Sequence, residues 1–227
     1  MGGFAASFIA QFVGFWIAFG LALFVPAGTV HWLAAWVFLG LFAAFYLFVS
    51  LWLARHNPGL LRERTQLRAA NQQGWDRWLF PAMLLGTFVW LAFLGLDGGR
   101  VHWSSEPPWL HSVGALTLLL SFVVLFLTFR ENSYLSPVVR VQEERGHSVI
   151  STGPYHYVRH PMYSGILIFF VGTSLLLGSW YGVLIGLLPL VMLARRAVME
   201  ERMLRRALPG YDTYQREVRY RLIPYIW

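Results

Sequence analysis

Residues 161–194 read PMYSGILIFFVGTSLLLGSWYGVLIGLLPLVMLA, and this stretch decides the fold. It contains two apolar runs, 161–178 and 182–194, which are separated only by residues 179–181. Runs of about twenty apolar residues match the roughly 30 Å hydrocarbon core of a bilayer. The stretch therefore predicts two membrane helices that form a tight antiparallel hairpin. Because the second run is short for a span, we expect its helix to continue through Arg195 into the cytosol.

Four further apolar runs precede the hairpin, at residues 4–25, 30–54, 78–96 and 109–129. Each is long enough for one spanning helix, and a hydrophobic content of 57% exceeds what a soluble core needs. The first run has no basic segment before it, so we expect a span there and not a cleaved signal peptide. The fold class is therefore all-α, a polytopic membrane helical bundle of about six spans.

The chain divides, on this interpretation, into two parts. Residues 1–129 would form four transmembrane helices. Residues 130–227 would form a C-terminal core made of a loop, the transmembrane hairpin 161–194 and the cytosolic tail 195–227.

The arginines predict the orientation in the membrane. The loop after the second run is rich in arginine, whereas residues 97–108 contain only Arg100. Since cytoplasmic loops carry an excess of basic residues, alternation places both termini, residues 130–159 and the tail on the cytoplasmic side. A belt of tryptophans is then expected at the opposite interface, formed by Trp32, Trp36, Trp103, Trp109 and Trp180.

Composition argues against several classes of protein. The chain has no cysteine, so disulfides, thiolate metal sites and cysteine nucleophiles are excluded. All 18 basic residues are arginines, but they are segregated from the aromatic residues, so nucleic-acid binding is not expected. No Asp, Glu or Arg lies inside the first five runs, which disfavours a pump or coupled transporter. We expect no metal site, because His31, His102 and His111 are scattered without a carboxylate cluster.

The mouth of the hairpin is where chemistry is expected. Because the two helices are antiparallel, the segment before residue 161 should meet the segment after residue 194 and form a polar cleft at the membrane surface. Pro161 suits a first helical turn and biases His160 toward an extended conformation. The free N–H groups of that turn favour an anionic or electron-rich ligand. A helix start anchored at the lipid headgroups is an equally good interpretation of residues 159–161.

A wider pattern of short motifs surrounds this point. The motifs are Gly153-Pro154-Tyr155, Arg159-His160-Pro161-x-Tyr163-x-Gly165, Glu200-Glu201-x-x-Leu204, Gly210-Tyr211-x-x-Tyr214 and Arg221-Leu222-Ile223-Pro224. In these residues the chain resembles the isoprenylcysteine carboxyl methyltransferase family of membrane methyltransferases, which is related to the phospholipid methyltransferases. The resemblance covers about residues 130–227, and the first four runs match only in being apolar.

The resemblance implies a cytosolic pocket for S-adenosylmethionine, built from the loop before the hairpin, the hairpin ends and the tail. Arg196 matches the family's substrate-contacting arginine, and a snorkelling interface arginine is the competing interpretation. In the tail, the match permits either Glu200 or Glu201 as the cofactor ligand. The cofactor-binding positions that the resemblance implies are Gln142, His147, Ser148, Val149, Ile150, Tyr155, His160, Pro161, Met162, Tyr163 and Glu200.

The chemistry of these side chains agrees with methyl transfer, which needs alignment more than acid or base catalysis. Tyr155 and Tyr163 can face a sulfonium or stack on adenine, and Glu200 can accept from ribose hydroxyls or an ammonium. Arg196 can present a planar fork to an acceptor carboxylate. The tyrosines of the tail could cover the cleft as a lid, but packing of the tail onto the membrane surface is the favoured interpretation.

The methyl acceptor is left open at this stage. A lipophilic acceptor with a carboxylate, of the isoprenylcysteine or isoprenoid type, is preferred to a phospholipid amine or a thiol. Two other functions compete: an NADPH-dependent membrane reductase of the steroid reductase type, and a non-enzymatic membrane scaffold. The expected partners are a lipophilic or lipid-modified acceptor and membrane lipid.

Overall fold

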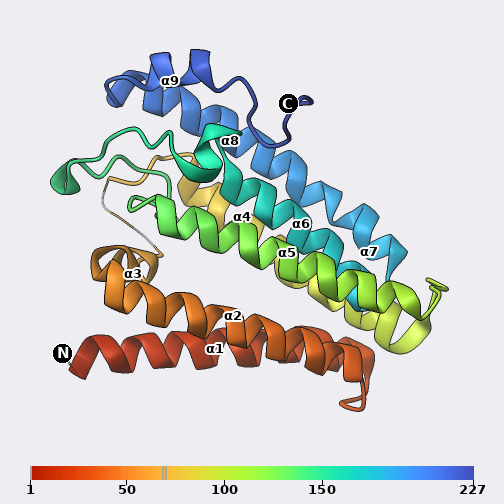
Figure 1. The fold of residues 1–227 in the computed structure, drawn as a ribbon. Coiled ribbons are helices and arrows are strands. Elements are labelled where there is room, and N and C mark those ends of the chain that lie inside the picture. The colour runs from red at the N-terminus through yellow and green to blue at the C-terminus, as the bar shows by residue number, and fades with distance from the viewer. Residues whose placement is uncertain (1, 68, 70) are drawn as a thin grey trace.

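The computed structural model describes residues 2–67, 69 and 71–227, and every regular element in these ranges is helical. Figure 1 shows the helices running side by side, with the N-terminus, α3 and α9 at one end of the bundle. The elements, in order, are α1 Gly2–Ala27, α2 Leu33–His56, α3 Pro58–Arg64, α4 Asp76–Leu96, η1 Asp97–Val101, α5 Trp109–Glu131, η2 Glu143–Arg145, η3 Gly153–His156, α6 Pro161–Leu176, α7 Trp180–Ile185, α8 Leu187–Ala207 and α9 Tyr211–Glu217.

The predicted fold class is confirmed: the chain is a multi-pass helical membrane protein. Within the described residues, five helical segments are long and apolar enough to cross a bilayer. They include the combined segment Trp180–Ala207, which contains α7 and α8. The sixth expected span corresponds to α6, a shorter apolar helix of 16 residues. The division of the chain at residue 129 stays a prediction.

The hairpin is present, but its second arm is broken. The arm consists of α7 and α8, which are separated at Gly186. Pro189 lies four residues after Ile185, so it cannot donate the hydrogen bond that a continuous helix would need there, and its ring would clash with that carbonyl. Beyond the break, α8 runs past Arg195 to Ala207, as the sequence predicts.

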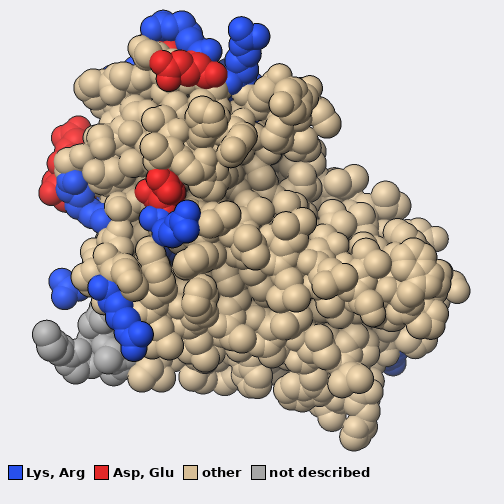
Figure 2. Space-filling view, viewed as in Figure 1, with Lys and Arg blue, Asp and Glu red and all other residues tan. Residues whose placement is uncertain are grey.

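Charged side chains mark one end of the bundle. Figure 2 shows them gathered, on this face, where α3 and α9 lie in Figure 1, whereas the body of the bundle is almost uncharged. At the other end lie the connections between α1 and α2, between α4 and α5, and between α6 and α7. The exposed tryptophans Trp36, Trp103, Trp109 and Trp180 belong to these connections or to the helix ends beside them.

The most extensive helix packing is between α5 and α6, and two glycines permit it. A Cβ atom added at Gly114 would lie 2.2 Å from the backbone nitrogen of Leu176. A Cβ atom added at Gly172 would lie 2.5 Å from the backbone nitrogen of Leu118. The two backbones are therefore in direct contact at both points, and α6 is held firmly against α5.

This packing predicts that Gly114→Ala destabilises the protein. The added methyl group must push the backbones of α5 and α6 apart, and overpacking of this kind costs about 1 to 3 kcal/mol. The matched control is Gly40→Ala in α2, where a Cβ atom meets nothing within 4 Å. Because alanine has a higher helix propensity than glycine, Gly40→Ala should leave the thermal midpoint in detergent unchanged or slightly raised. An equal effect of both substitutions would contradict the proposed contact.

Candidate functional site

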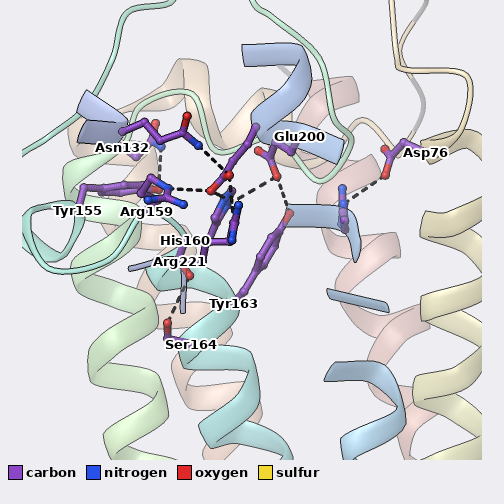
Figure 3. Close-up of polar contacts among 12 residues, drawn as sticks. Asp76, Asn132, Tyr155, Arg159, His160, Tyr163, Ser164, Glu200 and Arg221 are labelled. Carbon is purple, nitrogen blue, oxygen red and sulfur yellow. Dashed lines mark hydrogen bonds and ion pairs between the residues drawn. The ribbon is translucent and has the colours of Figure 1, made fainter. Parts of the chain in front are cut away.

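The start of α6 and the C-terminal half of α8 meet, as the hairpin predicts. Pro161 is the first residue of α6, and His160 precedes it in a non-helical conformation, with φ −127° and ψ 62°. One turn into α6, the Tyr163 hydroxyl donates a hydrogen bond of 2.7 Å to Glu200 Oε2, and Figure 3 shows it pointing at that carboxylate. The His160 and Tyr163 rings are stacked in parallel with their centroids 5.2 Å apart.

Glu201 is the centre of a buried ion-pair network. Its Oε1 atom accepts a 2.7 Å hydrogen bond from Arg159 Nε and lies 3.3 Å from His160 Nε2. Its Oε2 atom accepts from Arg221 Nε at 3.0 Å and from Gln215 Nε2 at 2.9 Å. The Glu201 side chain is only 1% exposed, and both of its oxygens already have partners within the protein. Glu201 therefore holds the tail against the start of α6.

Glu200 differs from its neighbour in accessibility. Its side chain is 26% exposed and lines a cavity, and the Tyr163 hydroxyl occupies only one of its two oxygens. Adjacent positions on α8 therefore divide two tasks: one glutamate faces inward to the network, and the other faces the cavity. Of the two residues that the motif match permitted, Glu200 is the one that is free to contact a ligand.

Arg196 lies one turn before Glu200 and has an acidic partner. Its Nε atom is 3.2 Å from Asp76 Oδ1, and its Nη2 atom donates a 2.6 Å hydrogen bond to the Pro137 carbonyl oxygen. Asp76 is fully buried at the first position of α4, where its other oxygen accepts from the Val139 N–H at 2.8 Å. Asp76 thus joins α4, α8 and the loop between α5 and α6, and it neutralises most of the charge of Arg196.

The loop 132–152 forms one wall of the site. His147 stacks on Tyr134 with ring centroids 4.4 Å apart, and its Nδ1 atom accepts a hydrogen bond from the Gln142 N–H at 3.3 Å. Burial, with the positive charges of Arg145 and Arg140, lowers the pKa of the His147 imidazole to about 4. The ring is therefore neutral at physiological pH and does not repel a cationic ligand.

Tyr155 belongs to η3, and the elements around it hold it in place. Its hydroxyl oxygen accepts a 2.7 Å hydrogen bond from Asn132 Nδ2, and its carbonyl oxygen accepts a 2.8 Å hydrogen bond from the Tyr214 hydroxyl. Burial raises the pKa of the Tyr155 phenol well above its usual value, so the ring stays uncharged. Tyr211 and Tyr214 pack in the same apolar cluster and also line the cavity, so these tail residues lie beside the cleft; packing of the tail onto the membrane surface stays a prediction.

A cavity of about 520 Å³ collects most of the predicted site residues. Gln142 and Pro161 are not among its lining residues. Gln142 is fully buried behind the wall, where its side chain bonds to the Tyr134 carbonyl and to Arg145. The predicted residues that line the cavity are His147, Ser148, Val149, Ile150, Tyr155, His160, Met162, Tyr163, Arg196 and Glu200.

The same cavity extends from this polar end into an apolar part between the helices. Aromatic side chains of α1 and α2 dominate the lining there, with contributions from α4 and α6. The aromatic residues of this apolar part are Phe8, Phe12, Phe15, Trp16, Phe19, Phe42, Phe45, Tyr46, Phe80, Phe169 and Phe170.

Sequence reasoning missed Asp76, Asn132 and Arg64, which belong to the site or line its cavity. One signal was available for Asp76, since it is an acidic residue directly before an apolar run and begins α4. His111, considered above as a possible metal ligand, lies with Nδ1 2.9 Å from the Leu176 carbonyl oxygen, a contact between α5 and the end of α6.

Comparison with known proteins adds independent information on the C-terminal part. Residues 109–209 match the phospholipid methyltransferase family. Protein-S-isoprenylcysteine O-methyltransferase B of Arabidopsis thaliana is 29% identical over 99 residues, and the A protein of the same plant is 28% identical over 101 residues. Each alignment covers 42% of this chain and 47% of the relative, so the chain spans about half the length of the curated relatives it matches. The resemblance drawn from the motifs is therefore confirmed: the segment from α5 to α8 matches the phospholipid methyltransferase family, and about 100 residues of the chain are similar to isoprenylcysteine methyltransferases.

Proposed function

We propose that this chain is an S-adenosylmethionine-dependent methyltransferase that acts on a lipophilic acceptor at the membrane surface. The observation that carries the proposal is the shape and lining of the cavity. Its polar end, between α6, α8 and the loop 132–152, offers a carboxylate and aromatic rings to a small polar cofactor. Its apolar end, between α1, α2, α4 and α6, offers room to a hydrocarbon chain. Both ends open into one space, so the two substrates can meet inside it.

The residues at the polar end suit the charge of the cofactor. S-adenosylmethionine carries a sulfonium and an ammonium, and when bound it supplies an electrophilic methyl group. Glu200 has a free carboxylate oxygen for the ammonium or for ribose hydroxyls, and the faces of Tyr155 and Tyr163 attract a cation. His147 is neutral, so it adds no repulsion. In this proposal Gln142 and Pro161 support the pocket from behind.

The protein's contribution to the reaction would be orientation and exclusion of water. The bond between Tyr163 and Glu200 fixes the carboxylate, and the stacked His160 ring fixes Tyr163 in turn. Methyl transfer needs the reacting atoms in line and about 3 to 3.5 Å apart, and a carboxylate acceptor needs no base to activate it. We propose that Arg196 holds that carboxylate through the guanidinium N–H groups that Asp76 and Pro137 leave free.

Two finer statements belong to the same proposal. The acceptor would be an isoprenylcysteine-type carboxylate, as the names of the plant relatives suggest. The match of residues 109–209 to the phospholipid methyltransferase family favours a phospholipid amine as the alternative acceptor. The end of the bundle that carries α3 and α9 would face the cytoplasm, because the arginines gather there.

The direct test is ligand-induced stabilisation of the purified protein in detergent. A ligand that binds only the folded state at a hundred times its Kd stabilises that state by about 2.7 kcal/mol. S-adenosylmethionine and its demethylated product should therefore each raise the thermal midpoint by several degrees, and NADPH should not. A shift with NADPH alone would support the reductase, and no shift with any of the three would support the scaffold. Methyl-transfer assays with a farnesylcysteine and with phosphatidylethanolamine would then distinguish the two acceptors.

A further inference from the structure

A second arginine, Arg64, lines the cavity, and it lies outside residues 109–209, which match the phospholipid methyltransferase family. Arg64 is the last residue of α3, and its guanidinium lies over the Phe129 ring at 4.9 Å from the centroid. Within the part of the chain that the structure describes, its one hydrogen bond is long, 3.5 Å from Nη1 to the Leu135 carbonyl oxygen. Within the described residues no carboxylate forms an ion pair with it, since the adjacent Glu63 is paired with Arg140.

The two cavity arginines are close to each other, but only Arg196 has a carboxylate that compensates its charge. Arg64 bonds to the carbonyl of Leu135 and Arg196 to the carbonyl of Pro137, two residues further along the same loop. Two residues of extended chain span at most about 7 Å. Arg196 has Asp76 beside it at 3.2 Å, so that pair is nearly neutral. Arg64 therefore supplies the uncompensated positive charge on this wall of the cavity.

An uncompensated cation next to an apolar space is costly for a protein. Burial, with the positive charge of Arg196, lowers the pKa of the Arg64 guanidinium to about 10, so it remains charged at physiological pH. Buried charges are normally paired, because desolvation without a partner is unfavourable. A ligand anion that entered the cavity would provide the missing partner and would be held at the border between the polar and apolar ends.

We infer that Arg64 is the residue that binds the anionic group of the lipid acceptor, a carboxylate or a phosphate, with Arg196 adding hydrogen bonds from the other side. That the bound lipid is the methyl acceptor rests on the proposed function. The binding of a lipid anion at Arg64 can be measured without turnover. The inference also assigns acceptor recognition in part to the N-terminal half of the chain, which lies outside the match to the phospholipid methyltransferase family.

The test measures equilibrium binding of three probes to the purified full chain in detergent. The probes are a farnesyl thioether carboxylic acid, its neutral carboxamide and a short-chain phosphatidic acid. Arg64→Gln should weaken the binding of at least one acidic probe by about tenfold or more, while the carboxamide should bind as it does to the unchanged protein. Arg64→Lys should bind the acidic probes with an affinity between that of the unchanged protein and that of Arg64→Gln. The matched control is Arg62→Gln, because Arg62 is an exposed arginine on the same helix and should bind every probe normally.

The pattern across the probes decides the inference. A loss confined to the carboxylic acid identifies a carboxylate acceptor, and a loss confined to phosphatidic acid identifies a phosphate headgroup; either supports the role of Arg64. Equal losses for the acid and the carboxamide, or no loss, would overturn it. If Arg64→Gln does not fold, the unchanged protein still decides: equal affinity for the acid and the carboxamide, together with no binding of phosphatidic acid, overturns the inference. Charge-dependent lipid binding without a thermal shift from S-adenosylmethionine would reject the proposed function and keep this inference.

Discussion

Replacing Glu201 with alanine is expected to destabilise the protein by about 3 to 5 kcal/mol. The substitution leaves Arg159, whose side chain is 4% exposed, as a buried charge without its carboxylate. It also removes the acceptor for Arg221 and Gln215, which tie the tail to α8. A loss of stability of this magnitude is exceptional for a single substitution. The variant should therefore show a markedly lower thermal midpoint in detergent or should fail to accumulate.

The matched control for this prediction is Glu200→Ala, one residue earlier on α8. Its side chain is partly exposed and has one hydrogen-bond partner, so the thermal midpoint without ligand should stay close to that of the unchanged protein. Cofactor affinity should fall by about ten- to a hundredfold, since a hydrogen bond to a charged group contributes about 1.5 to 3 kcal/mol. The opposite assignment, with Glu200 structural and Glu201 binding, would be indicated if the two effects were exchanged.

Replacing Arg196 should also produce a large defect in acceptor binding. Truncation of one partner of a desolvated charge pair costs about 2 to 5 kcal/mol, so Arg196→Ala should weaken a carboxylate acceptor by tenfold or more. Arg196→Lys keeps the charge but loses the planar fork that contacts Asp76 and Pro137 together, so an intermediate defect is expected. Arg196→Ala should also lower stability, because it leaves Asp76 buried without its cation.

The measurement must separate the two ligands. Acceptor and cofactor affinities would be determined independently for each variant, with Arg195→Ala as the control, because Arg195 is exposed on the neighbouring position of α8. Normal cofactor affinity with weakened acceptor binding supports the assignment. A defect confined to the cofactor would show that Arg196 belongs to the other ligand.

Much of the fold follows from patterns that are local in the sequence. Apolar runs of the right length predict membrane helices wherever they occur, and a three-residue gap between two runs forces a hairpin. The juxtaposition of His160 and Tyr163 with Glu200 follows from that hairpin, because antiparallel arms bring one start and one end together. The break at Gly186 could also be predicted from the sequence, because Pro189 has no N–H to donate to the carbonyl of Ile185.

The parts that could not be predicted depend on contacts between distant segments. Asp76 and Arg64 lie in the connection between the second and third apolar runs, and nothing in their spacing indicates that they approach Arg196 or the loop 132–152. The family resemblance implies that Gln142 contacts the cofactor, whereas the loop turns its side chain toward Tyr134 and Arg145. Loop paths of this kind are decided by tertiary packing and not by periodicity.

The main packing partner of α1 is not the helix that is synthesised next. α1 packs mainly against α4 and less against its neighbour α2, and a Cβ atom at Gly95 of α4 would lie 2.3 Å from the Leu23 carbonyl oxygen of α1. Residues 28–75, including all of α2, must leave the ribosome before α4 exists. Most of the surface that α1 presents to the rest of the bundle can therefore be covered by protein only after α4 has been synthesised.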